Sequence, residues 1–360
     1  MKVLFHTSIV NFQKANGGKT VVLKTKEYLE RAGIQVDLFD PWRTDIKDYD
    51  LIHCFTLHTT DLWQFVKDCD LKLAVTPLNW FGVYATPRSR AFRWLKRKVR
   101  GKIHCPLHSY WWEDCFGFPD VFFPQSELQA RQLGVAFGVS PNRIVPVHHG
   151  VDARFSAADP TLFTDRYRLT DFVLCVARFE PTKNQLGLIR ALKGTGIPLV
   201  FVGRPDSERF ASYYAQCVAE AGDSALFLGE LSHESPMLAS GYAAARVLAL
   251  PSFLEYPGVV VLEAGLAGCN VAVTREGTGR EYLGPHARYL DPRSAESIRQ
   301  TVLECYQHGP RPNTALQEHI RRHYLWETVI RGNIDGYHRI LGSTHGRAQP
   351  ASRLAESAPA

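Results

Sequence analysis

Apolar, β-branched runs alternate along the chain with longer stretches in which apolar positions recur at helical spacing. In the first half, this pattern predicts strands at 3–10, 34–39, 50–55, 73–77 and 121–124, with helices at 21–31 and from 126 onward. In the second half, it predicts strands at 172–177, 198–203, 225–228, 247–251, 271–274 and 287–290, and helices at 186–192, 207–221, 239–244, 262–267 and 295–307. Repeated strand–turn–helix–strand units favour parallel sheets covered by helices. The predicted fold class is therefore α/β, with two doubly wound, Rossmann-like sheets.

Chain length divides this pattern into two domains. A chain of 360 residues exceeds one ordinary hydrophobic core. Gly, Pro and Asp residues within 150–170 fit a linker, which gives a first domain at 1–160 and a second domain at 161–325. A further helix is expected at 326–342, and the Gly-, Ala-, Ser- and Pro-rich residues 343–360 are expected to be disordered. Two such sheets place a ligand cleft between the carboxyl ends of their strands.

Composition indicates a globular chain with reduced cysteines. Hydrophobic residues make up 45% of the chain and charged residues 22%, and no run approaches the roughly 18 apolar residues that span a bilayer. The apolar part of the N-terminal segment is too short for a signal peptide. The eight cysteines are dispersed, with no Cys-x-x-Cys pair, so we expect a cytoplasmic protein without a zinc site.

Positive charge is concentrated in the segment from Arg88 to Lys102. This segment has no acidic residue, and aromatic residues such as Trp94 are interleaved with its Lys and Arg residues. A basic amphipathic helix of this kind could bind an anionic membrane surface, which would place the protein at the inner face of the membrane. It could also bind a phosphorylated acceptor or nucleic acid, or form an ordinary solvated face. We favour the membrane or the anionic acceptor over nucleic acid.

Two carboxylates lie eight positions apart where the predicted strand at 247–251 gives way to a helix. Glu255 precedes the helix start and Glu263 falls in its early turns, with Gly258 and Val259 between them. Backbone N–H groups at a helix N-terminus attract an anion, so the two carboxylates and a phosphate site can share one cleft. Taken alone, such a pair is more often a solvated loop residue and a helix-capping residue.

Two cations follow the first predicted strand of the second domain. Arg178 and Lys183 are five positions apart, at the carboxyl end of that strand. A guanidinium can chelate phosphate oxygens and an ammonium supplies a point charge, so the pair suits a bound diphosphate. An ordinary surface charge pair is the simpler interpretation when the pair is considered without Glu255.

Several motifs resemble, in order, those of the retaining glycosyltransferases of family four, the "group 1" class with the GT-B fold. The resemblance spans about residues 1–341 and includes a glycine turn, a linker motif, the cation and carboxylate pairs, and an aromatic residue in the last helix. These are Gly17-Gly18; His149-Gly150-Val151-Asp152 with Phe155; Arg178 and Lys183; Phe227-Leu228-Gly229; Pro251-Ser252 before Glu255; Glu263-Ala264 with Gly268; Gly277 to Glu281; and Trp326.

The resemblance implies a role for each of these residues. Glu255 would contact hydroxyls of a donor sugar and Glu263 the ribose hydroxyls of a nucleotide. Arg178 and Lys183 would stabilise the departing diphosphate, whose charge develops as the glycosidic bond breaks. Glycine turns let the backbone approach a diphosphate closely, which assigns Gly17 and Gly18 to the donor site, together with Gly258 and Val259. The resemblance implies no cofactor and no metal, with the nucleotide-diphosphate sugar as substrate.

The chain departs from the family pattern after the fourth predicted strand. Many family members carry a His there, whereas this chain has Asn79 and Trp80. Asn79 can hydrogen-bond a sugar hydroxyl but cannot act as a base at neutral pH, and Trp80 could form a platform for a sugar ring. His53 and His58 are candidate substitutes, although a lone His is more often structural.

The sequence therefore predicts a GT-B enzyme with acceptor recognition in the first domain, donor binding in the second, and a last helix that returns to the first. The reaction would move a hexose from a nucleotide-diphosphate sugar to a hydroxyl of a glycan or lipid-linked acceptor. Two alternatives stay open: a GT-B epimerase or phosphorylase, which would use the same pair of sheets, and a catalytically inert module that binds a nucleotide or a sugar. An NTPase is excluded. A P-loop whose second glycine is Gly18 needs its first glycine five positions earlier, and Gln13 stands there.

Overall fold

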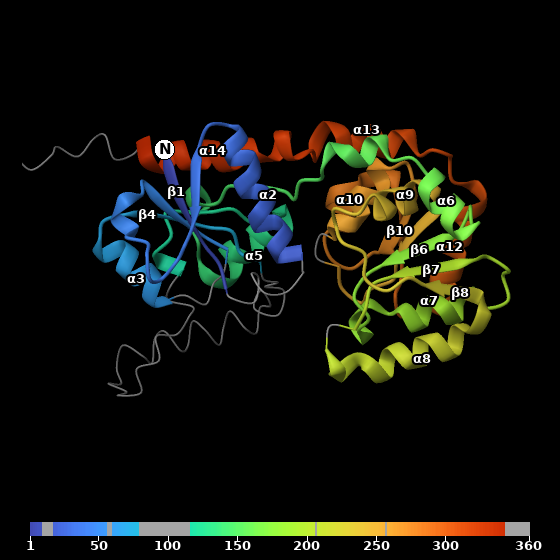
Figure 1. Cartoon of the computed structure of the whole chain (residues 1–360). Coiled ribbons are helices and arrows are strands. Elements are labelled where there is room, and N and C mark those ends of the chain that lie inside the picture. Colours follow the sequence, from blue (N-terminus) through green and yellow to red (C-terminus); the bar gives the residue numbers. More distant parts are fainter. Residues whose placement is uncertain (9–16, 56–59, 79–115, 206, 256–257, 343–360) are drawn as a thin grey trace, which may run out of the picture.

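The computed structural model describes residues 1–8, 17–55, 60–78, 116–205, 207–255 and 258–342. These residues form two parallel-sheet domains, as the sequence predicts (Figure 1). The first sheet contains β1 (Lys2–His6), β2 (Gln35–Leu38), β3 (Leu51–Cys54), β4 (Lys72–Val75) and β5 (Val121–Phe122). The second contains β6 (Val173–Val176), β7 (Leu199–Val202), β8 (Ala225–Phe227), β9 (Val247–Leu250), β10 (Asn270–Thr274) and β11 (Arg288–Leu290).

The order of the strands indicates where the second sheet binds a ligand. The first sheet has the order β2-β1-β3-β4-β5, and the second has the order β11-β10-β9-β6-β7-β8. Read from β6 outward, the second order is that of the Rossmann fold, with its switch point between β6 and β9. Ligands of such sheets bind beyond the carboxyl ends of the strands at the switch point. The loops after β6 and β9 are therefore the expected ligand site.

Helices cover both faces of the second sheet. Figure 1 shows α7 (Gln185–Leu192) and α8 (Ala211–Ala221) below this sheet, and α9 (Pro236–Ala244) and α10 (Val259–Leu266) above it. The other helices of this domain are α6 (Thr161–Tyr167), α11 (Gly279–Leu283), α12 (Ala295–His308) and α13 (Thr314–His323). The apolar strands β7 and β9 are buried at every position, as expected of a sheet covered on both faces.

The expected linker at 150–170 contributes to the second core. It contains a short 3-10 turn at Ala153–Ala157 and the helix α6. Phe155 and Phe163 are fully buried in the second domain's core, where Phe163 stacks on Phe172. The Gly, Pro and Asp residues therefore punctuate folded elements, and burial of two aromatic rings holds this segment on the second domain.

The last helix, α14 (Trp326–Gly342), lies along the first domain (Figure 1). Its apolar face, which includes Trp326, Ile330 and Tyr337, joins the core formed by β1, β3 and α2 (Gly17–Arg31). The other helices of the first domain in the described residues are α3 (Thr60–Asp68) and α5 (Glu127–Phe137). The last segment of the chain is thus bound to its first domain.

Candidate functional site

A lysine and a glutamate meet at the switch point of the second sheet. Lys183 ends the 3-10 turn Pro181–Lys183 after β6, and Glu255 follows β9. The Nζ atom of Lys183 lies 3.2 Å from Oε1 and 3.1 Å from Oε2 of Glu255. The sequence separates them by 72 positions, and the neighbouring strands bring them together because parallel strands end at one edge of the sheet.

Backbone contacts fix the loop that carries Glu255. The Glu255 N–H donates to the carbonyl of Glu276 at 3.2 Å, and the Thr278 N–H donates to the Glu255 carbonyl at 3.3 Å. Between these two bonds, Gly277 has φ +106°, and a Cβ atom there would overlap the Glu255 backbone. Only glycine therefore allows the loop after β10 to approach the Glu255 loop this closely.

Gly258 and Val259 form the start of α10. Gly258 is the N-cap residue, and Val259 is the first helical residue. A Cβ atom on Gly258 would lie 2.9 Å from Oε1 of Glu255, so glycine makes room for the carboxylate. The N-terminal N–H groups of α10 thus lie next to the Lys183–Glu255 pair, which favours an anion at this place.

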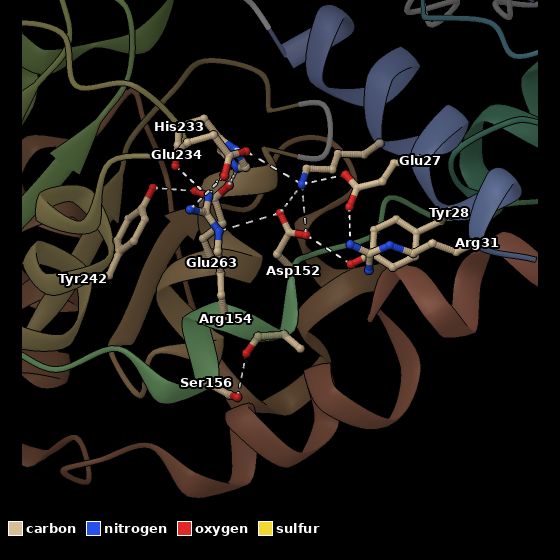
Figure 2. Close-up of polar contacts among 12 residues, drawn as sticks. Glu27, Tyr28, Arg31, Asp152, Arg154, Ser156, His233, Glu234, Tyr242 and Glu263 are labelled. Atoms are coloured by element: carbon tan, nitrogen blue, oxygen red, sulfur yellow. Dashed lines mark hydrogen bonds and ion pairs between the residues drawn. The ribbon is translucent and has the colours of Figure 1, made fainter. Parts of the chain in front are cut away.

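Glu263 lies one turn further along α10, but its carboxylate is covered. Its side chain is 2% exposed. The Tyr242 hydroxyl donates to Oε2 at 2.8 Å, and Nε2 of His233 lies 2.7 Å from Oε1 (Figure 2). Burial alone would lower the pKa of His233, but the hydrogen bond and charge of Glu263, with a further hydrogen bond to Glu234, raise that pKa above 6.5 overall. The predicted ribose-binding carboxylate is therefore already bound by two protein side chains.

An ion-pair cluster continues from His233 to the first domain. Glu234 lies beside Nδ1 of His233 at 3.1 Å and pairs with NH1 of Arg154 at 3.1 Å. Lys24, on α2 of the first domain, contacts both oxygens of Asp152 at 3.2 Å and Glu234 at 3.7 Å. Figure 2 shows the cluster reaching from Glu263 through Asp152 toward α2. It connects the two domains beside the candidate site.

A metal could draw on the same cluster. Asp152, His233 and Glu234 offer ligand atoms that all lie within 4.8 Å of one another. The ammonium of Lys24 and the guanidinium of Arg154 lie among these carboxylates. The cationic side chains therefore supply the charge that a bound metal ion would bring to this cluster.

Arg178 lies beside the site, whereas Gly17 and Gly18 lie at the start of α2 in the first domain. Arg178 lies on the same loop as Lys183; its side chain is 47% exposed, and its NH2 lies 3.7 Å from Glu180. Gly17 and Gly18, expected in a turn, are the first residues of α2. The surroundings of Gly17 leave open space for a Cβ atom, so steric crowding in this structure does not require glycine there.

His53 does not face the cleft, which corrects its assignment as a possible sugar contact. It is fully buried, with Nδ1 2.5 Å from the hydroxyl of Tyr337 and Nε2 2.8 Å from Oγ1 of Thr76. Burial lowers its pKa to about 3, so it is neutral near pH 7. The candidates His58, Asn79 and Trp80, and the basic segment 88–102, lie outside the described residues.

The cluster around Glu263 contains residues that the sequence analysis did not single out as a site. His233 and Tyr242 lie 30 and 21 positions before Glu263, on the loop after β8 and on α9. No local spacing marked them. Asp152 did carry a signal, since it belongs to the linker motif.

The part of the chain that carries this geometry is similar to a known family. Residues 167–321 match the family model "Glycosyl transferases group 1". This match covers most of the second domain and none of the first. Lys183, Glu255 and Glu263 all lie inside the matched segment, so the match confirms the resemblance for the part of the chain that carries the switch point.

Curated proteins that are similar to this chain are named D-inositol 3-phosphate glycosyltransferase. The protein of Mycolicibacterium paratuberculosis is 32% identical over 169 residues, which cover 44% of this chain and 37% of the relative. The protein of a Nocardioides species is 27% identical over 253 residues, which cover 61% of this chain and 54% of the relative. The chain thus spans roughly 37–54% of the length of these relatives.

Solved structures match the whole architecture. Sucrose-phosphate synthase from Thermosynechococcus elongatus has a TM-score of 0.75 at 18% identity, covering 96% of this chain and 100% of that one. Anabaena HepE, solved with UDP and glucose, has a TM-score of 0.70 at 17% identity, covering 93% and 98%. At these identities the likeness concerns the fold, and it confirms the predicted GT-B architecture. Within the described residues, no helix is both long enough and apolar enough to cross a bilayer.

Proposed function

We propose that the protein is a retaining, metal-independent glycosyltransferase. It would transfer a hexose from a nucleotide-diphosphate sugar to a hydroxyl of a glycan or lipid-linked acceptor. The bond between the anomeric carbon and the diphosphate oxygen breaks, the acceptor oxygen bonds to the same carbon from the same face, and the acceptor proton passes to the leaving phosphate. The match to the group 1 family model and the GT-B fold support a nucleotide-sugar donor.

The observation that carries the proposal is the meeting of Lys183 and Glu255 at the switch point. In the structure each neutralises the other at 3.1–3.2 Å. A diphosphate beside the start of α10 would give Lys183 a second anionic partner, and Arg178 lies on the same loop. Positive charge held there stabilises the negative charge that develops on the leaving group. Glu255 would accept hydrogen bonds from hydroxyls of the transferred sugar.

The acceptor is proposed to bind the first domain. The relatives named D-inositol 3-phosphate glycosyltransferase act, by name, on a phosphorylated polyol. An anionic acceptor or an anionic membrane surface would also match the basic segment 88–102. We therefore propose a cytoplasmic enzyme that binds peripherally to the inner face of the membrane.

The first experiment incubates the full chain with UDP-, GDP- and ADP-hexoses, with and without EDTA, and measures release of the nucleoside diphosphate. We expect slow donor hydrolysis or transfer with one base, unaffected by EDTA, and NMR of the product showing a retained anomeric configuration. Lys183→Gln and Glu255→Gln are expected to lower kcat/KM at least about a hundredfold, as loss of one preorganised charge partner does. Lys193→Gln, at a surface pair with Glu220, is the matched control.

Two outcomes would contradict this proposal. Nucleotide binding by calorimetry without any turnover would support the inert binding module instead. Loss of activity in EDTA that Mg²⁺ restores would contradict metal independence. For the membrane claim, replacing Arg93, Lys96, Arg97 and Arg100 by Ser should weaken sedimentation with anionic liposomes; unchanged sedimentation would exclude that surface.

A further inference from the structure

The carboxylate assigned to the donor ribose cannot reach a ligand in this structure. Glu263 is 2% exposed, whereas the side chain of His233, bound to its Oε1, is 27% exposed. Tyr242, the partner of Oε2, is fully buried in the second core. Of these two partners, only His233 reaches the surface, so it is the one that a ligand can displace.

We propose that His233 is a positioning residue of the donor site. Its imidazole occupies the place of a ribose hydroxyl on Glu263 and moves away from Glu263 when a nucleotide binds. This inference rests on the proposed function, because it takes Glu263 as the ribose-binding carboxylate. Nε2 of His233 donates to Oε1 of Glu263 in the unliganded protein, and a ribose hydroxyl donates to the same oxygen in the complex. The hydrogen-bond count of Glu263 is then unchanged, and its buried charge is never left without a partner.

Charged groups behind the ring determine how firmly His233 stays on Glu263. Oε1 of Glu234 lies 3.1 Å from Nδ1, which stabilises a ring protonated at both nitrogens. Arg154 donates to the His233 carbonyl at 2.6 Å, which fixes the backbone. Its NH2 also lies 3.2 Å from Nδ1, where its positive charge opposes protonation of the ring, whereas the carboxylates of Glu263 and Glu234 favour it. A charge-assisted bond from an imidazolium to a carboxylate is stronger than a neutral one. Glu234 therefore strengthens the contact that the ribose must replace.

Competition between His233 and ribose predicts a specific pattern of affinities. In the wild type, the free energy gained from the 2′-hydroxyl is reduced by the loss of the His233–Glu263 bond. Without the imidazole, the hydroxyl would gain its full contact with a charged acceptor, worth about tenfold in affinity or more. The ratio of the Kd of a 2′-deoxynucleoside diphosphate to that of its ribo form should therefore rise when His233 is removed.

The test measures, by calorimetry, Kd values of UDP, GDP and ADP and of their 2′-deoxy forms. For the base that binds the wild type, His233→Ala is expected to tighten the ribonucleotide and raise the deoxy-to-ribo ratio about tenfold. Glu234→Gln, which keeps the ring, is expected to raise the ratio by less. His233→Gln, whose amide can still donate to Glu263, should stay near the wild type. His308→Ala and Glu220→Gln, both in the second domain away from this cluster, are matched controls.

The outcomes separate the two proposals. If the wild type binds none of the nucleoside diphosphates, the donor site itself fails and this inference fails with it. If the wild type binds but His233→Ala weakens both forms equally, or leaves the ratio unchanged, His233 is only a structural residue and the inference alone is overturned. Glu234→Gln keeps the test decisive if His233→Ala does not fold, because an unchanged ratio in this variant also contradicts the competition.

Discussion

His53 and His149 lie in positions where protonation is unfavourable. Both are buried, and burial lowers the pKa of each to about 3; the neighbouring charge of His148 adds to the effect at His149. His53 binds Tyr337 of α14 and Thr76 after β4, so it connects the last helix to the first sheet. His233 differs from both because its carboxylate partners raise its pKa. The same residue type thus serves as a neutral core group at His53 and as a partner of carboxylates at His233.

The buried histidines predict that acid destabilises the protein. A histidine with a pKa of about 3 when folded and 6.5 when unfolded binds more protons in the unfolded state between these values. The free energy of unfolding should therefore fall as pH drops below 6.5, by about 2 kcal/mol per histidine at pH 5. Urea unfolding at pH 7.5, 6 and 5 measures this slope.

Variants identify the source of that acid slope. His149→Gln should remove the contribution of His149 to the fall in the free energy of unfolding at low pH. His308→Gln, at an exposed position of α12, should leave that fall unchanged. An equal slope in the wild type and in His149→Gln would show that His149 is protonated in the folded state.

At the scale of elements, loops far apart in sequence define the site. The strands and the presence of α10 could be predicted because apolar runs, glycines and the carboxylate pair leave local signals, although α10 begins at Val259 and not at the expected residue 262. The contacts of Glu263 could not, because the partners come from α9 and from the loop before it, whose spacing resembles ordinary helix and loop sequence. The interpretation of 150–170 as a linker missed that this segment is part of the second core. Turn residues show where the chain bends, but the burial of Phe155 and Phe163 depends on the whole domain.

Gly277 links two of these loops, and its substitution should displace Glu255. In Gly277→Ala, the new Cβ would overlap the Glu255 carbonyl, and φ +106° is strained for any side chain. We expect a stability loss of about 1–3 kcal/mol and a fall in kcat/KM, because the Glu255 loop must move. Gly222→Ala is the matched control: its φ is +51°, but open space surrounds it. Donor turnover and thermal unfolding of both variants should be compared; equal turnover in both would contradict a positioning role for Gly277.

At the scale of the whole molecule, the residues that the structure describes join the domains at three places. The first is the place where the chain passes twice between the domains, at residues 150–151 and 324–326, called the hinge below. There the Val151 N–H donates to the Tyr324 carbonyl at 2.8 Å, and Gly150 packs against the indole of Trp326. The Lys24 cluster forms the second contact. The third is α11, on which Glu281 and Tyr282 reach the first domain. The Lys24 cluster and the α11 contact consist of ion pairs and hydrogen bonds. The angle between the domains can therefore change when only a few polar contacts break and re-form.

Glu281 is the strongest candidate for holding the domains at this angle. Its Oε1 accepts from the Glu127 N–H at 2.6 Å, at the N-terminus of α5, and lies 2.8 Å from Nε2 of His148. Burial would raise the pKa of Glu281, but the hydrogen bonds from His148 and Glu127 outweigh it and lower that pKa. The charged carboxylate of Glu281 therefore stabilises the contact between α11 and the first domain above about pH 4.5. This contribution is lost as the pH falls through the lowered pKa of Glu281.

Glu281→Gln should therefore loosen the domain contact without disturbing either core. We expect it to weaken the contact by about 1–3 kcal/mol, because a hydrogen-bonded charge at a helix N-terminus is lost. Small-angle X-ray scattering should show a larger radius of gyration than in the wild type, and the fold of each domain should be intact by circular dichroism. Glu318→Gln, at a surface cluster on α13 with Arg321 and Arg322, is the matched control and should scatter like the wild type. If Glu281→Gln scatters like the wild type as well, the hinge and the Lys24 cluster are sufficient to set the angle, and α11 only packs against a domain that they have already positioned.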